Sequence, residues 1–242
     1  MSVVVVRPAP QGERTAKVLR ETGIAAVAVA LTAQGDPADG GAALDAALAD
    51  LGAVELVAVA SAEGARRLLA ALGSRVPGEG CEIAAVGPST AEVLERAGLV
   101  VYAMESSGGA ALAEAIGEPA RPGARAVVLM AEGGRPELAD GLEAAGWSVD
   151  RVVAYATVPV QPSEGELAQL GAAELLVVAA PSSARRVVEL VGSATTSGQP
   201  RRVVAIGSTT AAESASLGLE VAKVAAEPND AGVLEAVEDL LA

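Results

Sequence analysis

Residues 54–73, VELVAVASAEGARRLLAALG, decide the fold, because their pattern returns in residues 173–192, AELLVVAAPSSARRVVELVG. Each stretch begins with a continuous apolar run, which is typical of a strand that is covered on both faces in a parallel sheet. Each continues as a helix-forming segment and ends at a glycine, the residue preferred just past a helix end. We therefore predict that the chain contains the same strand–helix unit twice.

Two further pairs of segments repeat in the same order. Residues 86–99, VGPSTAEVLERAGL, return as 206–219, IGSTTAAESASLGL, and residues 7–23 more loosely resemble residues 130–146. The similarity could also arise because any two strand–helix units share the same general residue pattern. Here the loop residues and the helix ends coincide as well, which indicates a true repeat. The predicted fold class is α/β, with two similar lobes, each a parallel sheet flanked by helices, and a cleft between them.

The individual elements follow from the apolar runs and from the segments between them. The predicted strands are Ser2–Val6, Leu56–Ala60, Ile83–Val86, Ala126–Met130, Leu175–Ala179 and Val203–Ile206. The predicted helices are Gln11–Thr22, Gly64–Leu72, Thr90–Ala97, Arg135–Ala145, Ala184–Val191 and Thr210–Leu217.

Composition excludes several kinds of chemistry. The 242 residues include no His and a single Cys, Cys81. A Ser–His–Asp triad, a Cys–His dyad, a His-ligated zinc site and an internal disulfide are therefore excluded. One cysteine fits a reducing, cytoplasmic setting. The opening apolar run, Ser2–Val6, is too short for a signal peptide or a membrane span and reads as a buried strand.

The net charge of −14 restricts the partners. A negative field repels nucleic acid, and the chain contains no basic run. An anionic ligand would need local donors, such as the backbone N–H groups at helix starts.

Hydroxyl-bearing loops follow four of the predicted strands, where ligands of open parallel sheets bind. The loops are 60–64, ASAEG, with 87–90, GPST, and their copies 180–183, APSS, and 207–210, GSTT. Ser89 or Thr90 is expected to cap the helix that follows. Any one loop is explained by capping alone, but four loops that face one cleft favour anion binding.

Tyr155 is a candidate acid, since a phenol can donate a proton to a leaving hydroxyl group, although a tyrosine in a strand usually only packs.

Segment 132–135, EGGR, lacks the spacing of a dinucleotide-binding loop. Arginines 66, 67, 185 and 186 could reach carboxylates or lie on a solvated helix face.

These residues resemble the uroporphyrinogen-III synthase family along the full chain. The resemblance is carried, in order, by an opening strand that ends in Arg7-Pro8, by loops 87–91 (GPSTA) and 207–211 (GSTTA), by turn 132–135 (EGGR) and by segment 153–157 (VAYAT).

The resemblance implies two lobes joined by a two-stranded linker, with residues 1–34 and 159–242 in the first and 37–156 in the second. It implies cyclisation of hydroxymethylbilane to uroporphyrinogen III, with inversion of ring D and loss of water, as a step of heme biosynthesis, without metal or cofactor. Tyr155 would be the acid for the ring-A hydroxyl. The expected contacts to the substrate carboxylates are Arg7, Ser61, Gly64, Gly87, Ser89, Thr90, Ser182, Ser183, Gly207, Ser208, Thr209 and Thr210.

The chain departs from the family pattern at four positions. Ala60 and Ala180 stand where relatives carry hydroxyl residues, and Ala131 stands where many have Arg. Each lost hydrogen bond to a charged group could cost about 1.5–3 kcal/mol. Glu63 would oppose a carboxylate substrate.

We predict that the protein is a lyase that acts in the cytoplasm as a monomer. Its expected partner is a small-molecule substrate, hydroxymethylbilane, and we expect it to bind neither nucleic acid nor a membrane. A non-catalytic module that binds a tetrapyrrole or another anion is the alternative, and a periplasmic-type small-molecule binder is a weaker one, against which the absence of a signal peptide argues.

Overall fold

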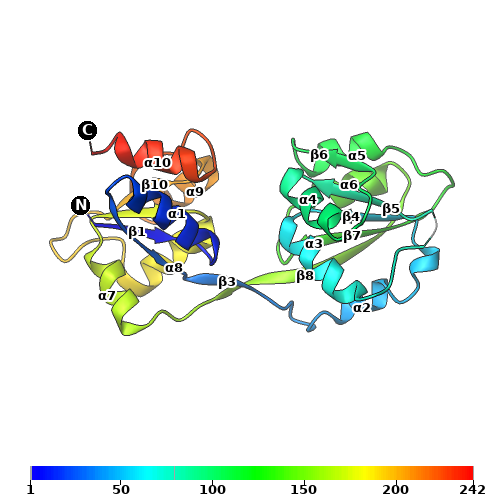
Figure 1. Ribbon diagram of the computed structural model, residues 1–242, viewed down its shortest axis with the longest axis horizontal. Helices are drawn as coiled ribbons and strands as arrows, with labels where there is room; N and C mark the ends of the chain where they lie inside the picture. Colours follow the sequence, from blue (N-terminus) through cyan, green and yellow to red (C-terminus); the bar gives the residue numbers. More distant parts are fainter. Residues whose placement is uncertain (1, 79, 242) are drawn as a thin grey trace. The chain divides into compact units, whose positions relative to one another are not determined.

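The structure is a computed structural model that describes residues 2–78 and 80–241 (Figure 1). The chain forms two compact units, one from Met1–Ala33 and Val158–Ala242 and the other from Gln34–Thr157. We call them unit 1 and unit 2. Strand β3 (Thr32–Gly35) and the end of β8 (Ser148–Pro159) are neighbours in sheet order, and they carry the chain between the units.

Unit 1 contains a parallel sheet in the order β11-β10-β9-β1-β2. Helices α1 and α10 pack on one face through Leu19 and Val233, and α7 and α8 pack on the other through Leu170 and Val187, with α9 beside α8. The bounds are β1 (Ser2–Val6), α1 (Gln11–Glu21), β2 (Ala25–Val29), α7 (Glu164–Ala172), β9 (Leu175–Val178), α8 (Pro181–Val191), β10 (Arg202–Ala205), α9 (Ser208–Ser216), β11 (Glu220–Val224) and α10 (Asp230–Glu238).

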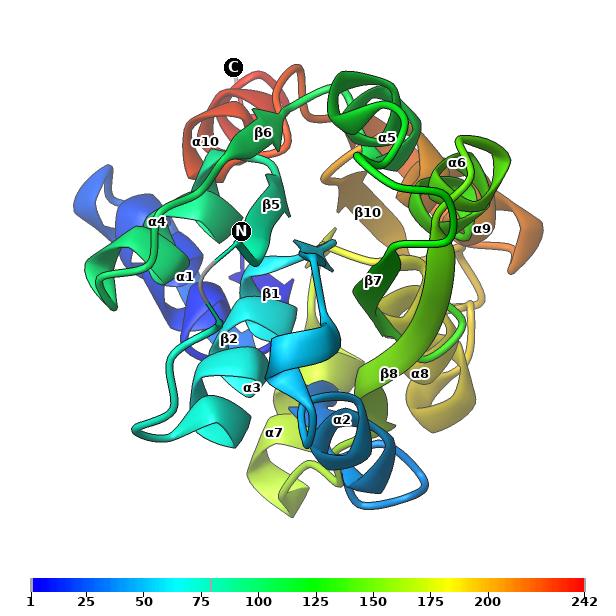
Figure 2. The same ribbon diagram turned by 90° about the vertical axis from the view of Figure 1, so that its right-hand side faces the viewer.

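Unit 2 contains a sheet in the order β3-β8-β7-β4-β5-β6, parallel from β8 to β6. Helices α2, α3 and α4 cover one face, and α5 and α6 cover the other (Figure 2). The remaining bounds are α2 (Ala42–Ala47), the 3₁₀ turn η1 (Leu51–Ala53), β4 (Leu56–Val59), α3 (Ala62–Leu72), β5 (Glu82–Val86), α4 (Pro88–Arg96), β6 (Ala103–Glu105), α5 (Gly109–Ile116), β7 (Arg125–Ala131) and α6 (Glu137–Ala144).

The sequence repeat corresponds to equivalent positions in the two sheets. In the paired segments β4 corresponds to β9, β5 corresponds to β10, and in the looser pair β7 corresponds to β1. Unit 2 accordingly has β5-β4-β7 at the centre of its sheet, and unit 1 has β10-β9-β1. The predicted fold class of two similar α/β lobes is confirmed.

The six predicted strands are all present, but the sequence analysis missed β2, β3, β6, β8 and β11. Four of the missed strands, β2, β3, β6 and β11, lie at sheet edges, where a strand does not need the continuous apolar run of a central one. Helices α2, α5, α7 and α10 were also not predicted.

Five predicted helix starts were wrong by two or three residues. Four helices begin earlier than predicted, at Ala62, Pro88, Pro181 and Ser208, and α6 begins at Glu137, two residues after the predicted Arg135. Proline at the first helical position has a suitable φ and needs no N–H partner, so Pro88 and Pro181 open their helices and do not precede them. In α4, α8 and α9 the shift moves hydroxyl residues from the cap into the first helical turn, whereas in α3 it makes Ser61 the N-cap.

Candidate active site at the carboxyl ends of the strands

Tyr155 and Ser61 form a hydroxyl pair in unit 2. Ser61 Oγ and Tyr155 Oη lie 3.0 Å apart, although the residues are 94 positions apart in the chain. Ser61 follows β4 and Tyr155 lies on β8, so two strands bring the pair together at the carboxyl end of the sheet. Tyr155 is 8% exposed, so most of its side chain is withdrawn from solvent.

A strand irregularity directs Tyr155 toward Ser61. Met130 pairs with Val153, but the next residue, Ala131, pairs with Tyr155, so β8 carries one extra residue at this point. Such a bulge reverses the alternation of side chains across a strand. Ala154 and Tyr155 therefore both join the core cluster under α3 and α4, and Tyr155 can reach the start of α3.

Ser61 also caps α3. Its Oγ accepts a hydrogen bond from the backbone N–H of Gly64 at 3.0 Å. A Cβ added at Gly64 would lie 3.3 Å from Ser61 Oγ and from Val59 Cγ1, so glycine permits the close approach. Because Oγ accepts from Gly64, the single hydroxyl proton of Ser61 is free to be donated to Tyr155, and the phenolic proton is then available to a ligand.

Replacement of Ser61 by Ala should lower the free energy of unfolding by about 1 kcal/mol, because the Gly64 N–H loses its capping acceptor. Urea unfolding followed by circular dichroism measures the change. Ser89→Ala is the matched control, since Ser89 is exposed and α4 has no side-chain cap, and we expect a change within about 0.5 kcal/mol. Equal losses in the two variants would contradict the capping role.

The start of α4 corrects the prediction that Ser89 or Thr90 is the N-cap. Gly87 occupies that position with φ +80°, a conformation that favours glycine, and no side chain caps the helix. Ser89 lies exposed in the first turn, and Thr90 is buried at 1% exposure. The Gly87 N–H donates to Glu105 O in the sheet at 2.9 Å.

Unit 1 repeats this arrangement at α8 and α9. Ala180 and Gly207 are the N-caps, and neither helix has a side-chain cap. Ser183 and Thr210 are buried like Thr90, whereas Ser182 is half-buried and Ser208 and Thr209 are exposed. Among residues 2–78 and 80–241, Ser183 Oγ has no hydrogen-bond partner. Both helix starts lie at the carboxyl ends of neighbouring strands, where their first N–H groups are available to an anion.

Arg7 follows β1 at the same edge of the unit 1 sheet, and its guanidinium is already engaged. It donates to Thr15 Oγ1 at 3.1 Å and to Asp230 Oδ1 at 2.9 Å. Arg14 also pairs with Asp230 at 3.2 Å. The ion pairs link α1 to the first turn of α10, so Arg7 holds the helices that frame this edge.

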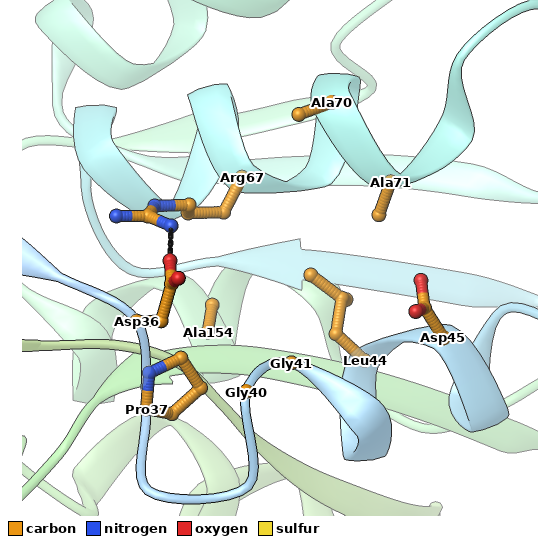
Figure 3. A pocket seen from close by; sticks show the side chains of 10 residues that line it. All are labelled: Asp36, Pro37, Gly40, Gly41, Leu44, Asp45, Arg67, Ala70, Ala71 and Ala154. Carbon is orange, nitrogen blue, oxygen red and sulfur yellow. Dashed lines mark hydrogen bonds and ion pairs between the residues drawn. The ribbon is translucent and has the colours of Figure 1, made fainter.

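Glu63 is neutralised by two arginines, a feature that the sequence did not reveal. Arg66 contacts its carboxylate at 2.8 Å and Arg67 at 3.0 Å. Arg67 also binds Asp36, which Figure 3 shows beside a small pocket under α3. The pKa of Arg67 is raised, chiefly by its hydrogen bond with Asp36.

The other two repeated arginines also form ion pairs within their own unit. Arg185 contacts Glu213 and Arg186 contacts Glu189, each at 2.6 Å. All four arginines therefore form ion pairs with carboxylates of their own unit.

The arrangement offers a phenol held by a second hydroxyl, with helix starts nearby in the same unit that can bind anions. This combination can transfer a proton next to a carboxylate-bearing ligand.

No group of three His, Cys, Asp or Glu side chains in the described part of the chain is placed to hold a metal. None of the described helices is long and apolar enough to span a bilayer.

Comparisons with known proteins identify relatives along the whole chain. The family model described as Uroporphyrinogen-III synthase HemD matches residues 13–235. The structure of uroporphyrinogen-III synthetase from Helicobacter pylori matches with a TM-score of 0.68 at 18% identity, covering 99% of each chain. A mutant uroporphyrinogen III synthase from Thermus thermophilus matches with a TM-score of 0.65 at 17% identity, covering 100% of this chain and 98% of that one. No curated protein matches the sequence.

Proposed function

The chain belongs to the uroporphyrinogen-III synthase family, and we propose that Tyr155 is the acid of its reaction. The family reaction is a cofactor-independent cyclisation of hydroxymethylbilane to uroporphyrinogen III, and this chain is accordingly a cyclising lyase. The 3.0 Å contact between Tyr155 and Ser61 is the observation that carries the residue assignment.

The first step removes the hydroxyl group of the substrate. The carbon–oxygen bond breaks with both electrons on oxygen, and the phenolic proton of Tyr155 converts the leaving group to water. The pyrrole nitrogen next to the carbon stabilises the cation that remains. Ser61 supports this step by donating its hydroxyl proton to the phenolate oxygen that forms, while its own oxygen stays bound to the Gly64 N–H.

The second half of the cycle restores the acid. The cation bonds to the ring D carbon that already carries the methylene bridge from ring C, and that bridge bond then breaks. The released methylene cation bonds to the other free carbon of ring D, which inverts the ring, and that carbon loses its proton. The Tyr155 phenolate is a suitable base for this proton, so one group serves as acid and then as base. Substrate and product differ by one water molecule, and no oxidant or reductant is needed.

We propose that helix starts in both units bind the substrate carboxylates. The accessible hydroxyls of Ser89, Ser182, Ser208 and Thr209 and the first backbone N–H groups of α3, α4, α8 and α9 are the donors. The buried Thr90, Ser183 and Thr210 shape the helix starts, and Arg7 positions α1 and α10. Pairing of Glu63 with Arg66 and Arg67 reduces the repulsion that an isolated carboxylate would exert.

We further propose that residues 1–34 and 159–242 form one lobe of the synthase and residues 37–156 the other. The compact units, which divide at Ala33/Gln34 and at Thr157/Val158, support these limits. The single cysteine supports action in the cytoplasm. A monomer is the expected state, and light scattering of the purified chain measures it.

Conversion of hydroxymethylbilane, followed by isomer analysis of the oxidised porphyrins, tests the function. The type III isomer should form faster than the type I isomer of the spontaneous reaction. Formation of the type I isomer alone, at the rate seen without protein, would show that this chain does not catalyse the family reaction.

A further inference from the structure

A second pocket lies at the amino ends of the unit 2 strands. Glu55 directly precedes β4, Glu82 begins β5, Tyr102 directly precedes β6, and Trp147 directly precedes β8. The pocket has a volume of about 550 Å³, within the range of small-molecule sites. Because these strands are parallel, their amino ends share one edge of the sheet, and Tyr155 and Ser61 lie at the opposite one.

The walls of the pocket combine apolar and aromatic surface. Trp147, Ile116, Ala120 and Ala124 supply apolar atoms. The indole N–H of Trp147 donates to Gly117 O at 2.8 Å, so its polar group is satisfied within the protein. Tyr102 is 59% exposed, which leaves its ring accessible to a ligand.

The charge in the pocket is negative. The carboxylates of Glu55, Glu82 and Glu118 line it, against one guanidinium, that of Arg121, which binds Glu55. Glu55 also accepts the Arg125 N–H at 2.7 Å, and this bond is the main cause that lowers its pKa. Among the described residues, neither Glu82 nor Glu118 forms an ion pair.

Cys81 lies beside Glu82 in the chain and is half-buried. Burial raises the pKa of its thiol to about 11, and the charges of Glu55 and Glu82 add to the increase. A cation in the pocket would therefore be attracted by two carboxylates without ion-pair partners and by the aromatic ring of Tyr102.

We propose that this pocket binds a small organic cation, an ammonium group attached to an aromatic or branched apolar body. The ammonium would lie near Glu82 and Glu118, and the body would contact Trp147 and Tyr102. The site is separate from the hydroxyl pair, so the proposal does not depend on the function of Tyr155.

The only Trp of the chain lines the pocket, so its fluorescence reports binding there. The probes are phenethylamine, 2-phenylethanol and phenylacetate, which share a body and differ in charge. We expect saturable quenching by the amine, an affinity about tenfold lower for the alcohol, and no saturation with the anion. Identical titrations with the amine and the alcohol, or no saturable response to the amine, would overturn the proposal.

Variants test which groups hold the cation. Glu82→Gln with Glu118→Gln should weaken phenethylamine binding about tenfold, while Glu114→Gln, which removes a single carboxylate on α5 outside the pocket, should leave it unchanged. Arg121→Gln should strengthen binding, because it releases Glu55 from its ion pair. Unchanged affinity in both the double variant and Arg121→Gln would refute the assignment, and synthase turnover should be unaffected in all of them.

Discussion

Replacement of Tyr155 by Phe is expected to lower kcat of the synthase by about 10²-fold or more, the usual contribution of a positioned general acid. The ring keeps its place in the core, since only the hydroxyl is removed, so the fold and KM should change little. Single-turnover assays with hydroxymethylbilane and isomer analysis measure the loss. Product from the variant should shift toward the type I isomer as the uncatalysed reaction competes.

The chain provides a matched control for this substitution. Tyr102 is its only other tyrosine, and it lies at the opposite edge of the unit 2 sheet. Tyr102→Phe should retain the turnover of the parent protein. If Tyr155→Phe also retained it, Tyr155 would not be the acid, whatever the other variants showed.

The hydroxyl pair can be tested by combining substitutions. Ser61→Ala should slow turnover less than Tyr155→Phe, because Ser61 acts through the phenol. In the double variant the two effects should not add, since residues that work as a unit give non-additive losses. Additive losses would mean that Ser61 and Tyr155 serve separate functions.

Replacement of Arg201 by Met should lower the free energy of unfolding by about 3 kcal/mol or more, because its guanidinium donates to several backbone carbonyls and each acceptor left unsatisfied costs about 1–3 kcal/mol. Arg201 is 4% exposed, and burial lowers its pKa. Its guanidinium donates to carbonyls at the ends of α7 and α8, including Gly171 O at 3.0 Å and Val191 O at 3.1 Å. The variant leaves these acceptors without the donor they have in the parent protein, at helix ends that favour a positive charge.

Urea unfolding of the full chain measures this loss, and Arg202→Met is its control. Arg202 is next in the sequence but 42% exposed, and its contact with Glu220 is 3.7 Å. We expect a change of less than about 1 kcal/mol there. Similar losses for the two arginines would contradict the role given to Arg201.

Much of the fold could be predicted because the central strands carry short-range signals. The runs at Leu56–Val59 and Leu175–Val178 are apolar throughout because helices cover both faces of their sheets. The repeat predicted two similar sheets, and their strand orders agree. Edge strands such as β6 escaped prediction, since an edge does not require such a run.

The candidate site was predicted less completely, because its contacts are non-local. Ser61 and Tyr155 were each identified as candidates, but nothing in their local sequence indicated that they meet. The ion pair of Arg7 with Asp230, which lies 223 residues away, likewise has no signal in the local sequence. The hydroxyls of Ser89 and Thr90 were assigned to a cap that Gly87 provides.

The sequence by itself determined the α/β class, the two similar units and the absence of histidine chemistry, since these depend on composition and on patterns within a few residues. Only the tertiary structure decided which side chains act together. The extra residue opposite Met130/Ala131 turns Tyr155 toward α3, and packing separates the buried Arg201 from the partly exposed Arg202. Strand register and burial depend on partners far away in the chain, and a local pattern does not encode them.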